Sequence, residues 1–184
     1  MKKIETKIKG VFIIEPDVFI DKRGYFFESY QTEKYKNIGI DDEFVQDNQS
    51  LSSFGTVRGL HFQIGDFAQT KLVRVVSGKV LDVAVDIRPE SKTFGKHIAE
   101  ELSDQNFKQL YIPAGFAHGF SVLSEVAIFL YKCTNFYSKD HERGILYSDP
   151  ELSIDWKVEK PTVSENDLNN SAFFEIRKQI LMGT

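Results

Sequence analysis

The sequence is poor in several features that would place it in a specialised class. It has one cysteine, Cys133, among 184 residues, so the chain forms no internal disulfide, which is typical of a reducing compartment. No apolar run approaches the roughly 20 residues of a membrane span. The opening MKKIETKIKG lacks the apolar segment of a secretory signal. Repeats and Gly/Ser linkers are also absent. We therefore expect one domain over residues 1–184, located in the cytoplasm and without a membrane partner.

An excess of charge of one sign is missing too. The net charge is −4, from 23 Lys and Arg against 27 Asp and Glu, and the two signs are interspersed, which argues against a nucleic-acid partner. Aromatic residues are plentiful: the chain has sixteen Phe and seven Tyr, within an apolar fraction of 41% that suffices for a core. Aromatic rings suit pleated surfaces and so favour a β-rich fold, and they can equally line a pocket for a ring-shaped ligand.

Short runs rich in β-branched and aromatic residues predict strands. The predicted strands cover 11–14, 25–30, 69–76, 79–88, 94–102, 107–112, 117–123 and 126–132. Within 79–88, apolar and polar residues alternate, and this period of two predicts an antiparallel sheet. Its second face, which carries Asp82 and Asp86, is then solvated or lines a pocket. Ser77 and Gly78 lie between two of the runs and predict a tight hairpin turn.

Helical signals are few and short. Residues 32–39 predict a helix with Thr32 as its N-cap and Gly39 at its end, and 164–170 predicts another that Ser164 caps. Within the C-terminal tail, 171–184, the segment 173–182 is amphipathic and predicts a helix. The rhythm of short strands favours an all-β fold, a jelly-roll antiparallel barrel or sandwich with a few short peripheral helices, over βαβ units.

Two histidines are candidates for chemistry. His61, in RGLHFQ at 58–63, is suited to a general base near neutral pH, and it could equally be hydrogen-bonded within a sheet. His118 follows a Pro-x-Gly turn, an arrangement that delivers a metal ligand in some jelly rolls. A metal site needs about three converging ligands, but no second histidine follows His61, and His97 and His141 lie among charged residues that predict surface positions. We therefore predict no metal site.

Tyrosines and cations form a weaker second group. Tyr131 and Tyr137, in the run 129–137, are suited to packing, to proton donation or to stacking on a base. Arg23, Arg58, Lys71 and Arg143 are of the type that binds diphosphate, and also of the type found on any solvated surface. No Walker loop, G-x-G-x-x-G turn or G-x-S-x-G elbow is present, so side chains would have to hold a phosphate.

Seven segments, taken in order, resemble the dTDP-4-dehydrorhamnose 3,5-epimerase family, whose members have a cupin-like jelly-roll fold. They are RGYFFE (23–28), VQDNQS (45–50), RGLHFQ (58–63), AQTKLVRVVSGKVLDVAVDIR (68–88), IPAGFAHGF (112–120), FLYK (129–132) and HERGI (141–145). The match spans about residues 10 to 168. Each segment alone is a weak signal, but seven in register are a strong one.

The resemblance implies an isomerase of dTDP-rhamnose biosynthesis. Its substrate is dTDP-4-dehydro-6-deoxy-D-glucose, which is inverted at C3 and C5 to give dTDP-4-dehydro-L-rhamnose. Both carbons flank the C4 ketone, so removal of a proton leaves an enolate, and no metal or other cofactor is expected. Inversion needs a base on one face of the sugar and an acid on the other.

The resemblance also implies roles for individual residues. His61 resembles the base, Asp167 the carboxylate that orients it, and Tyr131 the acid of the opposite face, while Lys71 resembles the stabiliser of the enolate oxygen. Substrate contacts are implied for Arg58 and His118 at the diphosphate and sugar, for Tyr137 stacked on thymine, and for Gln46, Asn48 and Glu142 at the nucleotide. Arg23 and Glu28 resemble a pair that reaches a neighbouring subunit's site, because the family's members are homodimers that exchange N-terminal sheet elements.

Two departures from the family leave alternatives open. Asn166 stands where the family often has lysine, and IGDF at 64–67 replaces a loop that commonly contains proline, so the nucleotide preference is less defined than the reaction. A relative that inverts a single carbon would have nearly the same residues. A non-catalytic sugar-nucleotide binding module would not need His61, Asp167 and Tyr131 together. A metal-dependent jelly-roll isomerase or oxygenase would need a second histidine near His61.

Overall fold

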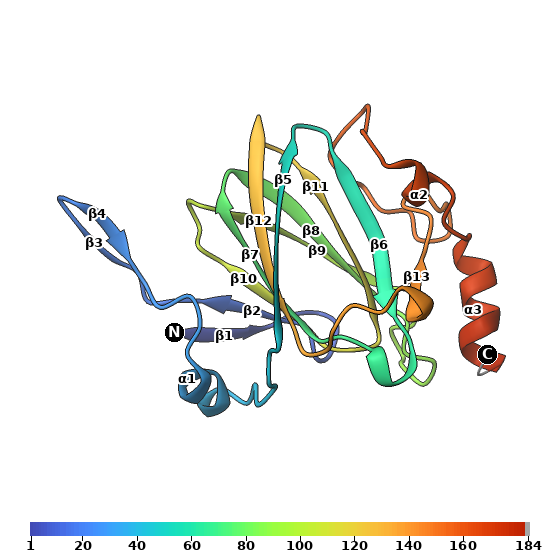
Figure 1. Cartoon of the computed structure of the whole chain (residues 1–184), viewed down its shortest axis with the longest axis horizontal. Coiled ribbons are helices and arrows are strands. Elements are labelled where there is room, and N and C mark those ends of the chain that lie inside the picture. The colour runs from blue at the N-terminus through green and yellow to red at the C-terminus, as the bar shows by residue number, and fades with distance from the viewer. Residues whose placement is uncertain (183–184) are drawn as a thin grey trace.

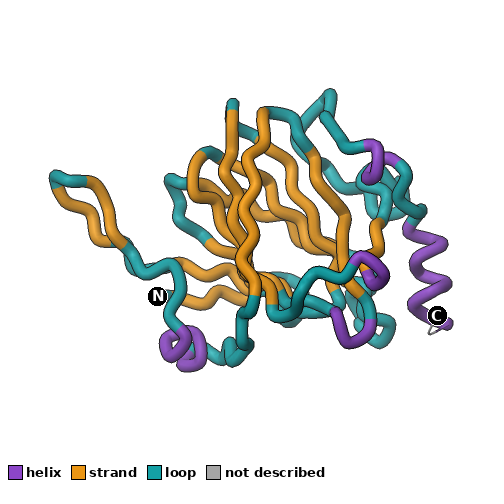
Figure 2. The backbone as a smooth tube through the Cα atoms, in the orientation of Figure 1, coloured by secondary structure: helices purple, strands orange, loops and turns teal. Residues whose placement is uncertain are grey.

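Two antiparallel sheets face each other in the computed structural model, which describes residues 1–182 (Figure 1 and Figure 2). The six-stranded sheet runs β1 (Lys2–Glu5), β2 (Phe12–Glu15), β10 (Gln109–Ile112), β7 (Lys71–Ser77), β12 (Val126–Cys133) and β5 (Gln46–Ser53). The five-stranded sheet runs β13 (Glu142–Gly144), β6 (Val57–Gln63), β11 (Phe116–Val122), β8 (Lys79–Asp86) and β9 (His97–Ser103). This arrangement confirms the predicted all-β jelly-roll class.

Within the described residues, three short α-helices lie at the periphery: α1 (Thr32–Asn37), α2 (Glu165–Leu168) and α3 (Phe173–Met182). Ser164 caps α2 as predicted, because its hydroxyl accepts a hydrogen bond from the N–H of Asp167 at 3.1 Å. The N-cap of α1 is Gln31 and not Thr32, because the side-chain Oε1 of Gln31 accepts a hydrogen bond from the backbone N–H of Lys34 in the first turn. Gly39 ends α1 as predicted, at φ +79°. Within residues 1–182, none of the helices combines the length and apolarity needed to cross a membrane.

A hairpin stands apart from both sheets. It consists of β3 (Phe19–Asp21) and β4 (Gly24–Phe26), and it projects away from the body of the molecule beside α1 (Figure 1). We call residues 19–26 the arm. Its large apolar side chains are solvent-exposed: Phe19 by 66%, Ile20 by 77%, Tyr25 by 55% and Phe26 by 66%. The strand predicted at 25–30 therefore ends early, at Phe26, where the arm turns back towards α1.

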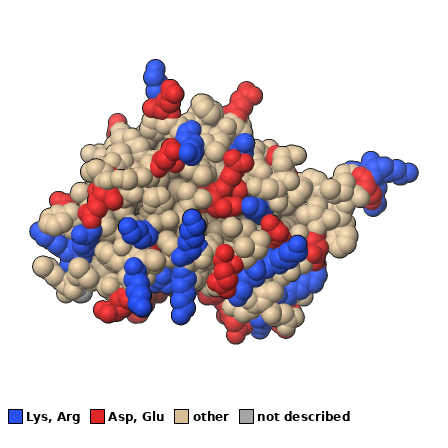
Figure 3. Space-filling view, turned by 180° about the vertical axis from the view of Figure 1, so that it is seen from behind, with Lys and Arg blue, Asp and Glu red and all other residues tan. Residues whose placement is uncertain are grey.

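The core has three parts. The first lies between the two sheets and includes Val73, Leu110 and Phe129. The second lies on the outer face of the five-stranded sheet, where Trp156 and Phe173 of the C-terminal segment cover it. The third packs the α1 segment on the six-stranded sheet. The surface outside these parts carries both signs of charge, interspersed on the face shown in Figure 3.

Most predicted strands are confirmed to within a few residues, and four strands were missed. One is β3 in the arm. The other three are β1, β5 and β13, with the sequences KKIE, QDNQSLSS and ERG. They consist mainly of polar residues because β1 and β5 lie at the edges of the six-stranded sheet and β13 at an edge of the five-stranded one. Hydrophobic periodicity therefore gives little signal for them.

The turn at Gly78 does not form the predicted hairpin. β7 and β8 lie in different sheets and are not paired, so the turn carries the chain from one sheet to the other. Gly78 has φ +81°, and a Cβ there would lie 2.1 Å from the carbonyl oxygen of Val126. A glycine is therefore needed at this corner. The predicted turn is confirmed, but the predicted pairing of the strands on either side of it is wrong.

The sequence predicted that the polar face of β8 is either solvated or lines a pocket, and the structure shows that its two aspartates are buried. β8 is an inner strand, and both Asp82 and Asp86 have 0% exposure. The carboxylate of Asp82 bonds Nε2 of His118 at 2.9 Å, and Asp86 accepts hydrogen bonds from Arg88, Ser91 and Thr93. Alternation was therefore a correct sign of a strand, but the polar residues serve buried hydrogen-bond networks.

Replacing Asp86 by asparagine is expected to lower the free energy of unfolding at pH 7 by about 2 kcal/mol. Burial alone would raise the pKa of Asp86, but the hydrogen bonds from Arg88, Ser91 and Thr93 lower it to about 2. Because this pKa is depressed by folding, the stabilisation is present above the unfolded value of about 4 and is lost as the pH falls towards 2. Denaturant titrations should show that the difference in free energy of unfolding between wild type and Asp86→Asn becomes smaller over this range. A difference that stays constant from pH 7 to pH 3 would contradict the role given to the Asp86 carboxylate.

Candidate active site

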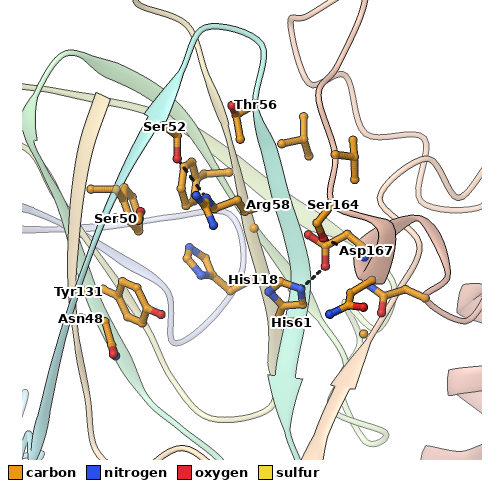
Figure 4. Close-up of a pocket in the computed structure, with 18 of the residues that line it drawn as sticks. Asn48, Ser50, Ser52, Thr56, Arg58, His61, His118, Tyr131, Ser164 and Asp167 are labelled. Carbon is orange, nitrogen blue, oxygen red and sulfur yellow. Dashed lines mark hydrogen bonds and ion pairs between the residues drawn. The ribbon is translucent and has the colours of Figure 1, made fainter. Parts of the chain in front are cut away.

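A cavity of about 1010 Å³ lies between the two sheets (Figure 4). Strands β6, β11 and β13 of the five-stranded sheet line one wall, and β5, β7 and β12 of the six-stranded sheet line the other. The N-terminal turn of α2 and the residues before it complete the rim. Most of the side chains that the sequence singled out lie in or next to this cavity.

His61 and Asp167 form a hydrogen-bonded pair on one wall. His61 lies on β6, and its Nε2 is 2.5 Å from Oδ1 of Asp167, which belongs to α2 (Figure 4). Asp167 is 4% exposed. Burial alone would raise the pKa of this carboxyl, but the hydrogen bond and charge of His61 and the N–H of Gly59 lower it below its ordinary value. A carboxylate held in its charged form fixes the imidazole and leaves the second ring nitrogen to accept a proton.

Tyr131 lies on the opposite wall. It belongs to β12 of the six-stranded sheet, so it faces the cavity from the sheet opposite that of His61 (Figure 4). Burial raises the pKa of the Tyr131 phenol, and the neighbouring Cys133 adds to this while Arg58 opposes it. The phenol therefore keeps its proton at neutral pH and can donate it. The cavity thus has a proton acceptor on one wall and a proton donor on the other.

Lys71 lies beside Tyr131, on β7. Its Nζ is 5.7 Å from the centre of the Tyr131 ring, and its side chain lines the cavity. Burial lowers the pKa of Lys71, and Cys133, Asp82 and Glu142 oppose this. A cation with little water around it interacts strongly with negative charge that develops nearby.

Arg58 and His118 face the cavity between these groups. Arg58 donates from Nε to the hydroxyl of Ser52 at 3.0 Å, and His118 is paired with the buried Asp82. His118 is the register partner of His61 in the β6–β11 ladder. The strands approach closely here because both carry glycine: a Cβ on Gly59 would lie 2.6 Å from Cα of Gly119.

The four residues with implied nucleotide contacts form a connected group. Gln46 donates from Nε2 to Asn48 at 3.0 Å, and its Oε1 accepts from the backbone N–H of Tyr137 at 3.0 Å. The Tyr137 hydroxyl donates to Glu142 at 2.8 Å. Asn48 and Glu142 line the cavity, while Tyr137 stands at its border with 56% exposure. The group therefore offers amide, carboxylate and ring surface at one edge of the cavity.

Four implied site residues do not line the cavity. Gln46 and Tyr137 are hydrogen-bonded to its lining residues Asn48 and Glu142, whereas Arg23 and Glu28 lie apart from it. Arg23, at the tip of the arm, is paired with Asp21, and Glu28 with Lys34 of α1. Neither lines the cavity of its own chain. The fourth cation, Arg143, does line the cavity, but its Nη1 donates to the carbonyls of Asp140 and Glu142.

The other two histidines were expected at the surface, and both are only partly exposed. His97 is half-buried, and burial, together with Lys96, lowers its pKa. His141 stacks on Phe67 at 4.2 Å between ring centres and bonds Ser138. Charged neighbours in sequence were therefore poor guides to their exposure. Among residues 1–182, no three His, Cys, Asp or Glu side chains come together in a way that would hold a metal ion.

Sequence reasoning found only part of one polar wall, because the resemblance implied Gln46 and Asn48 but neither Ser50 nor Ser52. These four residues alternate along β5 and are less exposed than the residues between them. The last three line the cavity. This period of two was present in the sequence, but a search for apolar alternation does not find it. Asp82, the partner of His118, was also missed as part of the site, although it had been noted as polar.

Comparisons with known proteins show the family of this chain. The family model described as dTDP-4-dehydrorhamnose 3,5-epimerase matches residues 5–175. The dTDP-4-dehydrorhamnose 3,5-epimerase of Shigella flexneri is 52% identical over 176 residues, which are 95% of this chain and 97% of that protein. The dTDP-6-deoxy-D-glucose-3,5-epimerase of Legionella pneumophila Philadelphia 1, solved in complex with dTDP-4-keto-L-rhamnose, has a TM-score of 0.93 and 46% identity, covering 97% of this chain and 96% of that one.

A more distant solved structure has a different specificity. It is a 3'-monoepimerase from Streptomyces bikiniensis in complex with dTDP-quinovose, and it has a TM-score of 0.89 and 29% identity, covering 96% of this chain and 91% of that one. The fold is thus common to enzymes that invert two carbons and to one that inverts a single carbon.

Proposed function

The chain belongs to the dTDP-4-dehydrorhamnose 3,5-epimerase family, and from this premise we propose which of its residues carry each step of the reaction. It is an isomerase that inverts C3 and C5 of dTDP-4-dehydro-6-deoxy-D-glucose to give dTDP-4-dehydro-L-rhamnose. The observation that carries the assignment of roles is the position of the His61–Asp167 pair and of Tyr131 on opposite walls of one cavity.

His61 removes the proton, and Tyr131 supplies one to the other face. The C4 ketone makes the C–H bonds at C3 and C5 acidic, so transfer of a proton to His61 leaves an enolate at each carbon in turn. Asp167 stabilises the imidazolium that forms. The Tyr131 phenol then gives its proton to the same carbon from the opposite side, and the new C–H bond has reversed configuration. Exchange with water returns His61 and Tyr131 to their starting protonation states.

Lys71 stabilises the negative oxygen of the enolate. It is a cation next to Tyr131 in the cavity wall, where a developing oxyanion would be close to it. Arg58 and His118 bind the diphosphate and sugar, and Ser52 holds the guanidinium of Arg58 in place. All the steps move protons only, so we expect the activity to survive treatment with a chelator.

The nucleotide lies at the Gln46, Asn48, Tyr137 and Glu142 edge. The Tyr137 ring is exposed enough to stack on thymine, and the amide and carboxylate groups next to it match the polar edge of a base. Asn166 lines the cavity where the family often has lysine. Asn166 has a neutral amide in place of the lysine ammonium, so the electrostatic attraction between this position and the negatively charged nucleotide is weaker.

The arm completes the site of a second copy in a homodimer. Its apolar side chains are exposed, and Arg23 lies at its tip with 83% of its side chain accessible, outside its own cavity. Docking on a partner would bury these rings and bring Arg23 and Glu28 to the partner's nucleotide. The site is then shared between two chains.

Mixing two defective chains tests this sharing. Arg23→Ala is expected to lower kcat/KM by roughly tenfold, the usual effect of losing a charged hydrogen bond, and His61→Asn inactivates its own cavity. A randomly mixed dimer places the intact arm of the His61→Asn chain on the intact cavity of the Arg23→Ala chain. Co-expression should therefore restore about a quarter of wild-type sites. Activity equal to the average of the two parent proteins would contradict a shared site.

The function itself is tested by NMR of the product. Purified protein is incubated with dTDP-4-dehydro-6-deoxy-D-glucose, and the proton couplings at C3 and C5 are followed. Inversion at both carbons supports the double epimerase. Inversion at one carbon would identify a single-centre epimerase, and an unchanged substrate would leave a sugar-nucleotide binding module. A loss of activity in chelator that a divalent ion restores would favour the metal-dependent alternative.

A further inference from the structure

Gln63, the last residue of β6 and of the RGLHFQ segment, has no role in the steps above. It is 8% exposed, and its side-chain amide makes three hydrogen bonds to backbone groups. Nε2 donates to the carbonyls of Phe67 at 2.8 Å and Phe136 at 3.1 Å, and Oε1 accepts from the N–H of Ser138 at 2.6 Å. Both amide protons and the carbonyl oxygen are therefore used.

Two of these bonds fix the residues on either side of Tyr137. Phe136 and Ser138 are both tied to Gln63, so the backbone that carries Tyr137 is held at both ends by one rigid strand. Gln63 is also the register partner of Glu142, the residue that accepts the hydrogen bond of the Tyr137 hydroxyl. One buried amide thus lies at the junction of the groups that form the nucleotide edge.

The rest of the loop is anchored independently. Gln69 donates to the carbonyl of Asn135 at 2.7 Å, and the Asn135 amide donates to the carbonyls of Asp66 and Ala68. These contacts do not include Tyr137 or its two neighbours. Without Gln63, the Phe136–Ser138 segment keeps the bonds of Tyr137 to Gln46 and Glu142 and of Ser138 to His141, but loses its two bonds to β6. Loss of the Gln63 bonds would therefore loosen this segment while the start of the loop stays in place.

We propose that Gln63 is a positioning residue for nucleotide binding, which acts by holding Tyr137 ready to stack on the base. The proposal rests on the proposed function, which gives Tyr137 its role. With Tyr137 fixed before binding, the substrate does not have to order an exposed ring on a free loop, and the entropic cost of binding is lower. Gln63 does not touch the reacting carbons, so its loss should weaken binding and leave the proton transfers intact.

Gln63→Leu keeps the size of the side chain and removes all three hydrogen bonds. We expect KM for the sugar nucleotide and Kd for dTDP to rise together by about tenfold, with kcat within about twofold of wild type. Ser91→Ala is the matched control, because Ser91 makes a comparable set of loop hydrogen bonds, to Asp86 and Thr93, away from the cavity. It should lower stability and leave KM and Kd unchanged. A fall in kcat with unchanged KM in Gln63→Leu would overturn the proposal.

A double-mutant cycle separates positioning from general destabilisation. Tyr137→Ala should itself weaken dTDP binding at least about tenfold, because Gln63 is proposed to act only through this ring. Adding Gln63→Leu to Tyr137→Ala should then weaken binding by less than about a further threefold, because the ring that Gln63 positions is already gone. A further tenfold loss in the double variant would overturn the proposal. If Gln63→Leu does not fold, Gln63→Glu serves instead, since it keeps the bond to Ser138 and sets a carboxylate oxygen against two carbonyls, and the same pattern is expected. An unaffected dTDP affinity in Tyr137→Ala would instead count against the role of Tyr137 in the proposed function.

Discussion

Replacing His61 by asparagine is expected to lower turnover by at least about 100-fold, the usual contribution of a general base. Asparagine keeps a polar group of similar size, but it cannot take a proton near neutral pH. The substrate still meets Arg58, His118 and the nucleotide edge, so KM should change little. Steady-state rates with the 4-keto sugar nucleotide measure the effect.

Asp167→Asn tests whether the pair acts as one unit. An amide at this position still fills the space beside His61, but it has no charge to stabilise the imidazolium, so turnover should fall here as well. Both variants should bind dTDP with nearly wild-type affinity, which would show that the cavity is intact. Near-normal turnover of His61→Asn would remove this residue from the role of base.

Replacing Tyr131 by phenylalanine is expected to lower the rate of inverted product by about 100-fold or more. The ring and its packing against Phe129 are retained, and only the hydroxyl is lost. Because burial raises the pKa of Tyr131, the wild-type phenol is protonated throughout the neutral range, so the loss should be similar at each pH from 6 to 9. Product formation followed over this range checks both statements.

Tyr111→Phe is the matched control for Tyr131→Phe. The Tyr111 hydroxyl donates to Asp42 at 2.6 Å outside the cavity, so the same chemical change should destabilise the protein slightly and leave turnover within about twofold. If Tyr131→Phe forms inverted product at the wild-type rate, the proton donor lies elsewhere in the cavity.

The sequence predicted strands well where the strand is buried and therefore consists mainly of apolar residues. Strands β7, β8, β11 and β12 are inner strands of their sheets, and their apolar composition predicted them within a few residues. The edge strands β1, β5 and β13 are polar and were missed. Local signals could not show which strands pair, because pairing depends on contacts that are distant in sequence. Gly78 illustrates this: it marks a turn, but the turn joins two sheets.

For the site, residue types alone identified His61, His118 and Tyr131 as candidates but could not bring them together. Asp167 lies 106 positions from His61, and no periodicity relates them. Only the resemblance to a family proposed that pair, and the structure places the two side chains in contact. Ser52 and Asp82 were not proposed as part of the site, since each acts on another residue, Arg58 or His118. Such supporting contacts depend on three-dimensional neighbours and have no local sequence signal.

The central claim is that a base on one wall and an acid on the other exchange the protons of C3 and C5. The most direct test is the reaction in deuterated water, with NMR used to locate the label in the sugar. The wild type should place deuterium at both carbons of the inverted product. Tyr131→Phe should place deuterium in sugar of unchanged configuration, because His61 can still remove a proton and return a deuteron to the same face. Label-free product from the wild type, or inverted and labelled product from Tyr131→Phe at the full rate, would contradict the account.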